Sequence, residues 1–372
     1  PGLLITELME PNERLLSLDT LRGFDMLFIM GFAGLITAIC ALWPNPMTDA
    51  IARQMGHVSW NGLTQHDTIF PLFLFIAGVS FPFSLSKQRA SGISERRILF
   101  KVIRRGMTLI VLGMIYNGLF RFDFASLRVA SVLGRIGLAW MFASLLYMYC
   151  KVRTRAVFAA VVLIGYSLLM YLVVAPDAPL SVAGNIAGWV DRQWLPGTFA
   201  CGSFDPEGLL STLPAIVSAL FGMFTGEFLL RKRSSLSGEQ IALCMALAAV
   251  AITVIGIIWN CWIPINKKLW SSSFTCVVTG YSLGLFALFY YLIDVRGWKR
   301  WTFFFRVIGL NSITIYLAQR IVGFGGIANF FFGGAASHCP EAIARVISNA
   351  GYVAICWLFL YFLYRKSTFL KV

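Results

Sequence analysis

Long apolar runs separated by short polar stretches dominate the sequence. Runs long enough to cross a membrane as helices occupy residues 17–43, 67–87, 101–121, 129–150, 154–174, 208–230, 240–263, 272–293, 302–323 and 342–364. A helix of about 20 apolar residues spans a bilayer. The pattern therefore predicts an all-α polytopic integral membrane helix bundle with about ten transmembrane helices, and the whole of residues 1–372 forms one domain.

The charges follow the same pattern. The chain is 58% hydrophobic and only 13% charged, which is more apolar than a soluble domain, and its net charge is +14. Lys and Arg gather in alternate connections, at residues 87–105, 151–155, 231–233, 296–300 and 365–371. Because basic residues near the ends of spans stay in the cytoplasm, these connections and both termini are predicted to be cytoplasmic. Topology thus explains the positive charge, and no nucleic-acid partner is expected.

Two connections on the predicted outer side are long, at residues 44–66 and 175–207. Loops of this length in a compact domain are usually functional or disordered. They contain Trp60, Trp189 and Trp194, which are either interfacial anchors or a surface on which sugars stack. Cys201 and Cys339 also fall in predicted outer loops, and the sequence leaves a disulfide between them open.

Several ionisable residues lie inside the predicted spans or at their ends. They are Asp19, Arg22, Asp25, Asp67, Arg135, Glu227, Arg306 and Arg320. Such groups are costly in a membrane and mark a functional site or a structural pair. Asp19, Arg22 and Asp25 share a helical face, so they either pair with one another or form a site. Arg135 lies beside glycines that allow close helix approach, which would turn its guanidinium inward toward an anion.

The segment HVSWNGLTQHD, residues 57–67, concentrates polar groups at the predicted outer membrane edge. A histidine oriented by a carboxylate or amide is the usual general base, which makes His57 a candidate, with Asn61 and Asp67 beside it. Zinc signatures, a Walker A loop and a GxSxG elbow do not occur in the sequence. We therefore expect neither metal chemistry nor nucleotide hydrolysis.

Six segments resemble one known family in collinear order. They are RLLSLDTLRG (14–23), HVSWNGLTQHDTIFPLFLFIAG (57–78), VASVLGRIGLAW (129–140), FDPEGLLSTLPAIV (204–217), PINKKLWSSSF (264–274) and GLNSITIYLA (309–318). Together they resemble heparan-α-glucosaminide N-acetyltransferase and its bacterial relatives. The resemblance implies transfer of an acetyl group from cytosolic acetyl-CoA, across the membrane, to the amino group of a terminal glucosamine.

The resemblance also implies roles for individual residues. It makes His57 the catalytic histidine and carries the asparagine of the same motif to Asn61. Asp67 is a further expected catalytic residue, from its place in the polar segment beside His57. The CoA cosubstrate is expected to contact Arg135, the one arginine among these with motif support. Arg22, Arg104, Arg105, Asn311 and Ser312 are expected to contact it as well, because the phosphates of CoA need cations and donors. The amino-sugar or glycan acceptor is expected to contact Trp60, Asp205, Glu207 and Lys268, with the outer loops 44–66 and 175–207 on the acceptor side. No metal is expected.

Several alternatives stay open at this stage. His57 either removes the proton during direct transfer, which we favour, or is itself transiently acetylated. Competing functions are O-acylation of an envelope polysaccharide and solute transport. The resemblance begins near residue 14, so we expect a bacterial relative without the luminal domain and additional first span of the animal enzyme. Its predicted location is the bacterial inner (cytoplasmic) membrane, and dimeric relatives suggest a homodimer.

Overall fold

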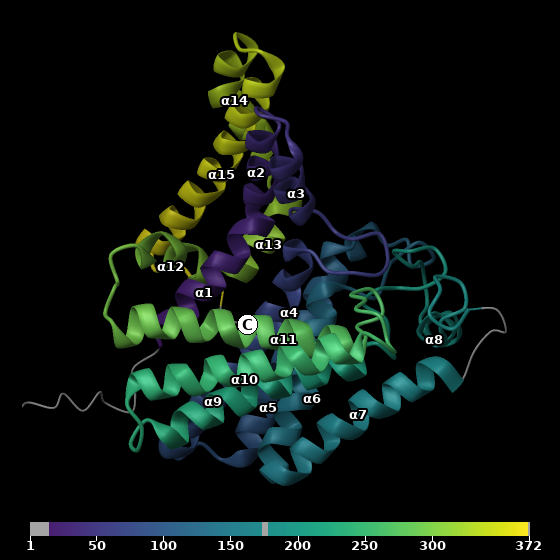
Figure 1. The fold of residues 1–372 in the computed structure, drawn as a ribbon. Helices are drawn as coiled ribbons and strands as arrows, with labels where there is room; N and C mark the ends of the chain where they lie inside the picture. Colours follow the sequence, from purple (N-terminus) through teal and green to yellow (C-terminus); the bar gives the residue numbers. More distant parts are fainter. Residues whose placement is uncertain (1–14, 173–177, 371–372) are drawn as a thin grey trace, which may run out of the picture.

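The computed structural model describes residues 15–172 and 178–370, which form a bundle of α-helices (Figure 1). These residues contain no strand, and only an isolated bridge pairs Arg128 with Gly197. The predicted all-α class is therefore confirmed. Lys371, residues 173–174 of the predicted fifth span and residues 175–177 of the predicted outer loop lie outside the described part.

The helices follow one another in this order. The first half contains α1 (Leu16–Leu27), η1 (Phe28–Phe32), α2 (Ala33–Cys40), α3 (Pro46–Gln54), α4 (Gln65–Ala90), α5 (Glu95–Tyr116), η2 (Leu119–Arg121), α6 (Val132–Tyr149), α7 (Val152–Leu172) and α8 (Ile186–Trp194). The second half contains α9 (Thr212–Lys232), α10 (Gly238–Trp259), α11 (Ser272–Phe289), η3 (Tyr290–Val295), α12 (Thr302–Leu310), α13 (Ser312–Ile321), α14 (Phe324–Ser337) and α15 (Glu341–Arg365).

Within the described residues, eight helices are long and apolar enough to cross a membrane, and a bent pair raises the number to nine. These eight coincide with eight of the ten predicted ranges, so the chain is a multi-pass membrane protein. The first of them, Leu16–Cys40, is kinked inside the π-helical turn η1, where Gly31 leaves the helical conformation with a φ of 110°. Burial varies among them, because α4 and α9 lie inside the bundle whereas α10 and α15 are largely exposed along its edge.

Two predicted spans differ from the structure. The range 101–121 corresponds to α5, which starts earlier and carries basic side chains in its first half, so it is less apolar than the eight helices above. The range 302–323 is not one helix, because α12 ends at Leu310 and α13 begins at Ser312. After α13 the chain bends by 78° into α14, a helix that the sequence pattern did not predict.

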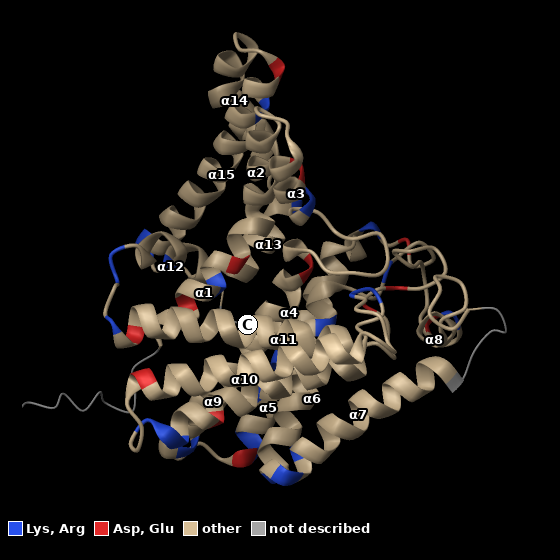
Figure 2. Cartoon of the chain, in the orientation of Figure 1, with Lys and Arg blue, Asp and Glu red and all other residues tan. Residues whose placement is uncertain are grey.

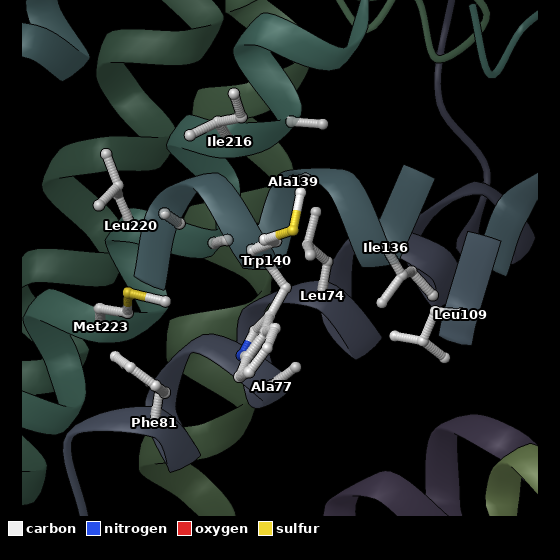
Figure 3. Close-up of a cluster of buried hydrophobic side chains, with 14 of the residues drawn as sticks. Leu74, Ala77, Phe81, Leu109, Ile136, Ala139, Trp140, Ile216, Leu220 and Met223 are labelled. Atoms are coloured by element: carbon white, nitrogen blue, oxygen red, sulfur yellow. The ribbon is translucent and has the colours of Figure 1, made fainter. Parts of the chain in front are cut away.

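The core forms where α4, α6 and α9 meet. Trp140 of α6 lies there among Leu74 and Phe81 of α4 and Met223 of α9 (Figure 3). The α4–α9 contact is so close that a Cβ on Gly222 would lie 2.2 Å from the carbonyl oxygen of Phe75. Glycine at this crossing lets the two backbones touch, which fixes the position of α4 in the bundle.

Charged residues gather near the ends of the helices, and the long middle sections of α7, α10 and α11 carry almost none (Figure 2). This distribution agrees with helices that cross an apolar layer. The cytoplasmic orientation of the termini stays a prediction. Cys201 and Cys339 are both free cysteines in this structure. Trp189 and Trp194 are exposed, whereas Trp60 is partly buried.

Candidate active site

The site begins where the loop after α3 enters α4. Thr64 is the N-cap of α4, and its backbone N–H donates to Oδ2 of Asp67 over 3.3 Å. The Thr64 hydroxyl lies 2.9 Å from the same oxygen. These contacts hold the Asp67 carboxylate, which is 1% exposed, in the first turn of the helix. The turn leaves the second oxygen, Oδ1, directed at the preceding loop.

His57 is bound to that oxygen. Its Nδ1 lies 2.7 Å from Oδ1 of Asp67, and its side chain is 55% exposed. A carboxylate can only accept, so the 2.7 Å contact assigns a proton to Nδ1, and a neutral ring in this arrangement has its lone pair on Nε2. The ring of His66 packs against that of His57 with centroids 4.6 Å apart. The predicted pair of His57 and Asp67 is thus brought together in the form that proton abstraction needs.

A second loop, between α10 and α11, closes over the His57 segment. The backbone N–H of Gly62 donates to the carbonyl of Ile265 over 2.8 Å, and the Asn266 amide donates to Oδ1 of Asn61 over 3.0 Å. Both loops lie at the end of the bundle near α8 (Figure 1). Because the oxygen of Asn61 is occupied, its amide NH₂ group is the part that can donate to a ligand.

Lys267 in this second loop was missed by sequence reasoning. Its Nζ lies 3.3 Å from Oδ1 of Asp67 and 3.2 Å from Nδ1 of His57. Burial lowers the pKa of Lys267, while the nearby carboxylates of Asp67 and Glu207 act to raise it. The motif PINKKLW did mark this stretch, but two adjacent lysines gave no sign of which one would reach the histidine.

Trp60 and Lys268, both predicted to bind the acceptor, lie next to each other beside His57. The indole N–H of Trp60 donates to the carbonyl of Leu180 over 2.8 Å, and its ring meets Phe204 edge to face. The ammonium of Lys268 donates to the carbonyl of Ser59 over 2.7 Å and lies 6.0 Å from the Trp60 ring. These contacts attach the outer loop 175–207 to the His57 segment.

Asp205 and Glu207 both bind Arg128. The guanidinium of Arg128 makes two 2.7 Å hydrogen bonds to the carboxylate of Asp205, whose side chain is 0% exposed, and it also contacts Glu207. Burial by itself would raise the pKa of Asp205, but hydrogen bonds from Arg128 and its charge hold that pKa below the usual value. This ion pair anchors the loop that leads into α9.

Arg135 lies on α6 beneath the same loop and is 1% exposed. It donates to the Ser211 hydroxyl and to the Gly208 carbonyl, and its guanidinium lies 5.1 Å from the ring centre of Trp270. Its Nε and Nη1 have no hydrogen-bond partner among the residues that the structure describes. The inward orientation that the neighbouring glycines predicted is therefore observed, with two donors left for a ligand.

The other predicted CoA contacts gather elsewhere, around two cavities that share Arg105. The first, of about 710 Å³, is lined by Arg22, Arg105, Arg306, Arg365 and Ser312 among others. The second, of about 580 Å³, is lined by Lys101, Arg104 and Arg105 together with Trp140. Arg306 and Arg365 are additions to the predicted set, which could not show that residues so far apart in sequence meet at one cavity.

The break between α12 and α13 forms part of the first cavity. Asn311 sits in the break and donates to the carbonyl of Thr368 over 3.1 Å, and Ser312 begins α13 at the cavity wall. A helix N-terminus presents unpaired backbone N–H groups and a partial positive charge. The arginines and this N-terminus together give the cavity the charge and the donors that suit a polyanion.

Some of the other intramembrane charges are paired within the bundle. Arg22 lies 3.5 Å from Asp19, in agreement with the pairing that their spacing allowed. Glu227 on α9 binds Arg155 of α7 over 2.8 Å, and this pair joins the two helices; Glu227 also contacts Arg231 of its own helix. Asp25 is buried, and its Oδ2 has no partner within the described part of the chain. None of these groups reaches the His57 site through a direct contact that the structure shows.

Comparison with known proteins gives two curated relatives, and no protein-family model matches the chain. Heparan-alpha-glucosaminide N-acetyltransferase of Homo sapiens is 27% identical over 378 residues, which cover 85% of this chain and 55% of that protein. The Mus musculus protein of the same name is 26% identical over 379 residues, covering 85% and 56%. The chain is thus a distant relative of these enzymes and spans about half of their length.

Proposed function

We propose that the protein is a transmembrane acetyltransferase. It moves the acetyl group of cytosolic acetyl-CoA to the amino group of a terminal glucosamine on the extracytoplasmic side, with His57 as the base. The observation that carries this proposal is the exposed His57, bound through Nδ1 to the buried Asp67. The names of the two relatives supply the reaction and the class of acceptor.

Helix α4 connects the two halves of the proposed site. Asp67 lies in its first turn, whereas Phe73 and Ala77 line the first cationic cavity and Ser80, Ser84 and Gln88 line the second. At 1.5 Å per residue, the cavities begin about 10 Å and end about 30 Å along the helix from Asp67. A cosubstrate with an anionic head in the cavities would thus have to direct its thioester along α4 toward His57.

The CoA phosphates would occupy the cationic cavities. Arg22, Arg105, Arg306 and Arg365 would donate charge-assisted hydrogen bonds there, with Ser312 at the start of α13. Arg104 would contribute from the second cavity. Arg135 lies near the other end of the pathway, beneath the loop into α9, so we assign it to the thioester end of the cosubstrate rather than to the phosphates.

In the proposed reaction the acceptor amine attacks the thioester carbonyl while Nε2 of His57 removes a proton from the nitrogen. The Asn61 amide donates to the oxyanion that forms. The N–C bond forms first, and the C–S bond breaks as the oxyanion collapses back to a carbonyl. The departing CoA thiolate takes the proton from the imidazolium of His57. The products are the N-acetylated sugar and CoA, and His57 returns to its neutral form.

The acceptor would approach over the outer loops. Trp60, Lys268 and Glu207 are the groups nearest to it in this proposal, whereas Asp205 is buried and holds the loop through Arg128. The same proposal places the protein in a bacterial inner membrane with cytoplasmic termini. The homodimer stays a prediction from the resemblance.

The test uses purified protein in sealed proteoliposomes with glucosamine inside and acetyl-labelled CoA outside. We expect labelled N-acetylglucosamine in the lumen, and no label when N-acetylglucosamine replaces glucosamine. Label on N-acetylglucosamine would indicate O-acylation instead. A protein that makes no acetylated product from either side of the membrane would refute the proposal.

The matched variant His57→Gln should reduce transfer by at least a hundredfold, because a positioned general base contributes about 10²- to 10⁴-fold. Its binding of CoA, measured as thermal stabilisation, should remain. Retained transfer would remove His57 from the mechanism. Exchange of label between acetyl-CoA and CoA without any sugar would replace direct transfer by an acetyl-histidine pathway.

A further inference from the structure

The surroundings of His57 contain a cation that the mechanism above does not use. Lys267 lies 3.2 Å from Nδ1 of His57 and 3.3 Å from Oδ1 of Asp67, so the three side chains form one compact cluster. The side chain of Lys267 is only 18% exposed. A buried lysine beside a catalytic histidine is costly unless it has a partner, and here the partner is the carboxylate that also orients the histidine.

The charged and titratable groups around this cluster come from several elements. Asp67 and His66 lie on α4 and face His57, and Lys267 comes from the loop before α11. Glu207, in the loop before α9, and Arg135 on α6 act electrostatically on Lys267. The ammonium of Lys268 lies on the Ser59 carbonyl beside the same segment.

The effect of Asp67 alone would be unfavourable for a base in acidic surroundings. A carboxylate in contact with a histidine favours the imidazolium, which has no lone pair and cannot accept a proton. A cation at the same distance opposes that effect. Because Lys267 contacts both members of the pair, its charge opposes that of Asp67, while the hydrogen bond from His57 to Asp67 that orients the ring is present.

We propose that Lys267 is a positioning residue, which keeps His57 neutral, with its proton on Nδ1 and its lone pair on Nε2, at mildly acidic pH. The inference rests on the proposed role of His57 as a base. It adds that the base is controlled by a carboxylate and a lysine together, and that the loop before α11 is part of the catalytic apparatus. Removal of the lysine charge should protonate His57 at higher pH.

The direct test is a histidine NMR titration of the detergent-solubilised protein. The chain has only three histidines, so the His57 signal can be assigned by its loss in His57→Gln. In Lys267→Met the titration midpoint of His57 should rise by about 1 pH unit, the shift expected for loss of a like charge within 4–6 Å. In Lys267→Arg it should stay near the wild-type value. An unchanged or lowered midpoint in Lys267→Met would overturn the inference.

The second readout is the pH dependence of kcat/KM for acetyl transfer, measured on the wild type, Lys267→Met and Lys267→Arg. The acid limb should move to higher pH by the same amount in Lys267→Met and should be restored in Lys267→Arg. A uniform loss of activity at every pH, with the acid limb in place, would show a merely structural role.

Failure of this inference differs from failure of the proposed function. A raised midpoint without any acetyl transfer in the wild type would refute the function and support the electrostatic role. Acetyl transfer by the wild type, with the His57 midpoint and the acid limb unaltered in Lys267→Met, would support the function and refute the electrostatic role. If Lys267→Met does not fold, Lys267→Gln retains hydrogen bonding without the charge, and the same shifts are expected from it.

Discussion

The ion pair between Arg128 and Asp205 allows a quantitative prediction about the outer loop. Asp205→Asn keeps the size of the side chain but removes its charge, and this leaves Arg128, 26% exposed, with Glu207 as its remaining carboxylate partner. Breaking a buried pair costs about 3 to 5 kcal/mol, and the remaining contact with Glu207 reduces this to about 2 to 3 kcal/mol. We expect the midpoint of thermal unfolding to fall by about 3 °C.

The assay is thermal unfolding in detergent of the wild type, Asp205→Asn, Arg128→Met and the double variant. In the double variant both members of the Arg128–Asp205 pair are replaced and only Glu207 loses its partner, so its loss should be smaller than the sum of the single losses. A coupling energy near zero, or a midpoint within 1 °C of the wild type for Asp205→Asn, would refute the reasoning and make the pair a peripheral contact.

The same variants predict a dependence on pH. The pKa of Asp205 is lowered in the folded state, so its contribution is present above the unfolded value of about 3.9 and is lost as pH falls through the folded value. Burial raises the pKa of Asp191, which acts in the opposite direction, so the difference between wild type and Asp205→Asn is the quantity to follow. That difference should shrink below about pH 4 and stay constant near neutrality.

Two further predictions concern packing and the cationic cavity. Gly222→Ala places a Cβ 2.2 Å from the Phe75 carbonyl oxygen and should lower the free energy of unfolding by about 1 to 3 kcal/mol. The control Gly165→Ala, whose Cβ would have no atom within 4 Å among the described residues, should be neutral or stabilising, and equal unfolding midpoints for the two variants would contradict the prediction. Arg306→Gln should raise KM for acetyl-CoA about tenfold through loss of a charge-assisted hydrogen bond, with kcat little changed. Arg320 lies over the ring of Tyr116 instead, so the control Arg320→Gln should leave KM unchanged. A fall in kcat alone in Arg306→Gln would contradict the assignment.

Local pattern in the sequence was enough to predict the membrane bundle. Apolar runs of spanning length, and polar segments between them, follow directly from the thickness of the hydrocarbon layer, and eight of the predicted ranges are helices of the expected kind. The contact between His57 and Asp67 was also predictable, because the two residues lie close in sequence and the turn that begins α4 joins them. Contacts between residues this close in sequence depend on local backbone geometry, which can be inferred from the spacing of the residues.

Only the tertiary structure brought Lys267 to His57, from 210 residues away. It also gathered Arg22, Arg105, Arg306 and Arg365 around one cavity, placed Arg135 apart from them, and broke the predicted span 302–323 beside that cavity. Hydrophobic periodicity says which face of a helix is buried but not which helix covers it. Pairing of distant segments is decided by packing across the whole bundle, and the chemistry of the site depends on that pairing.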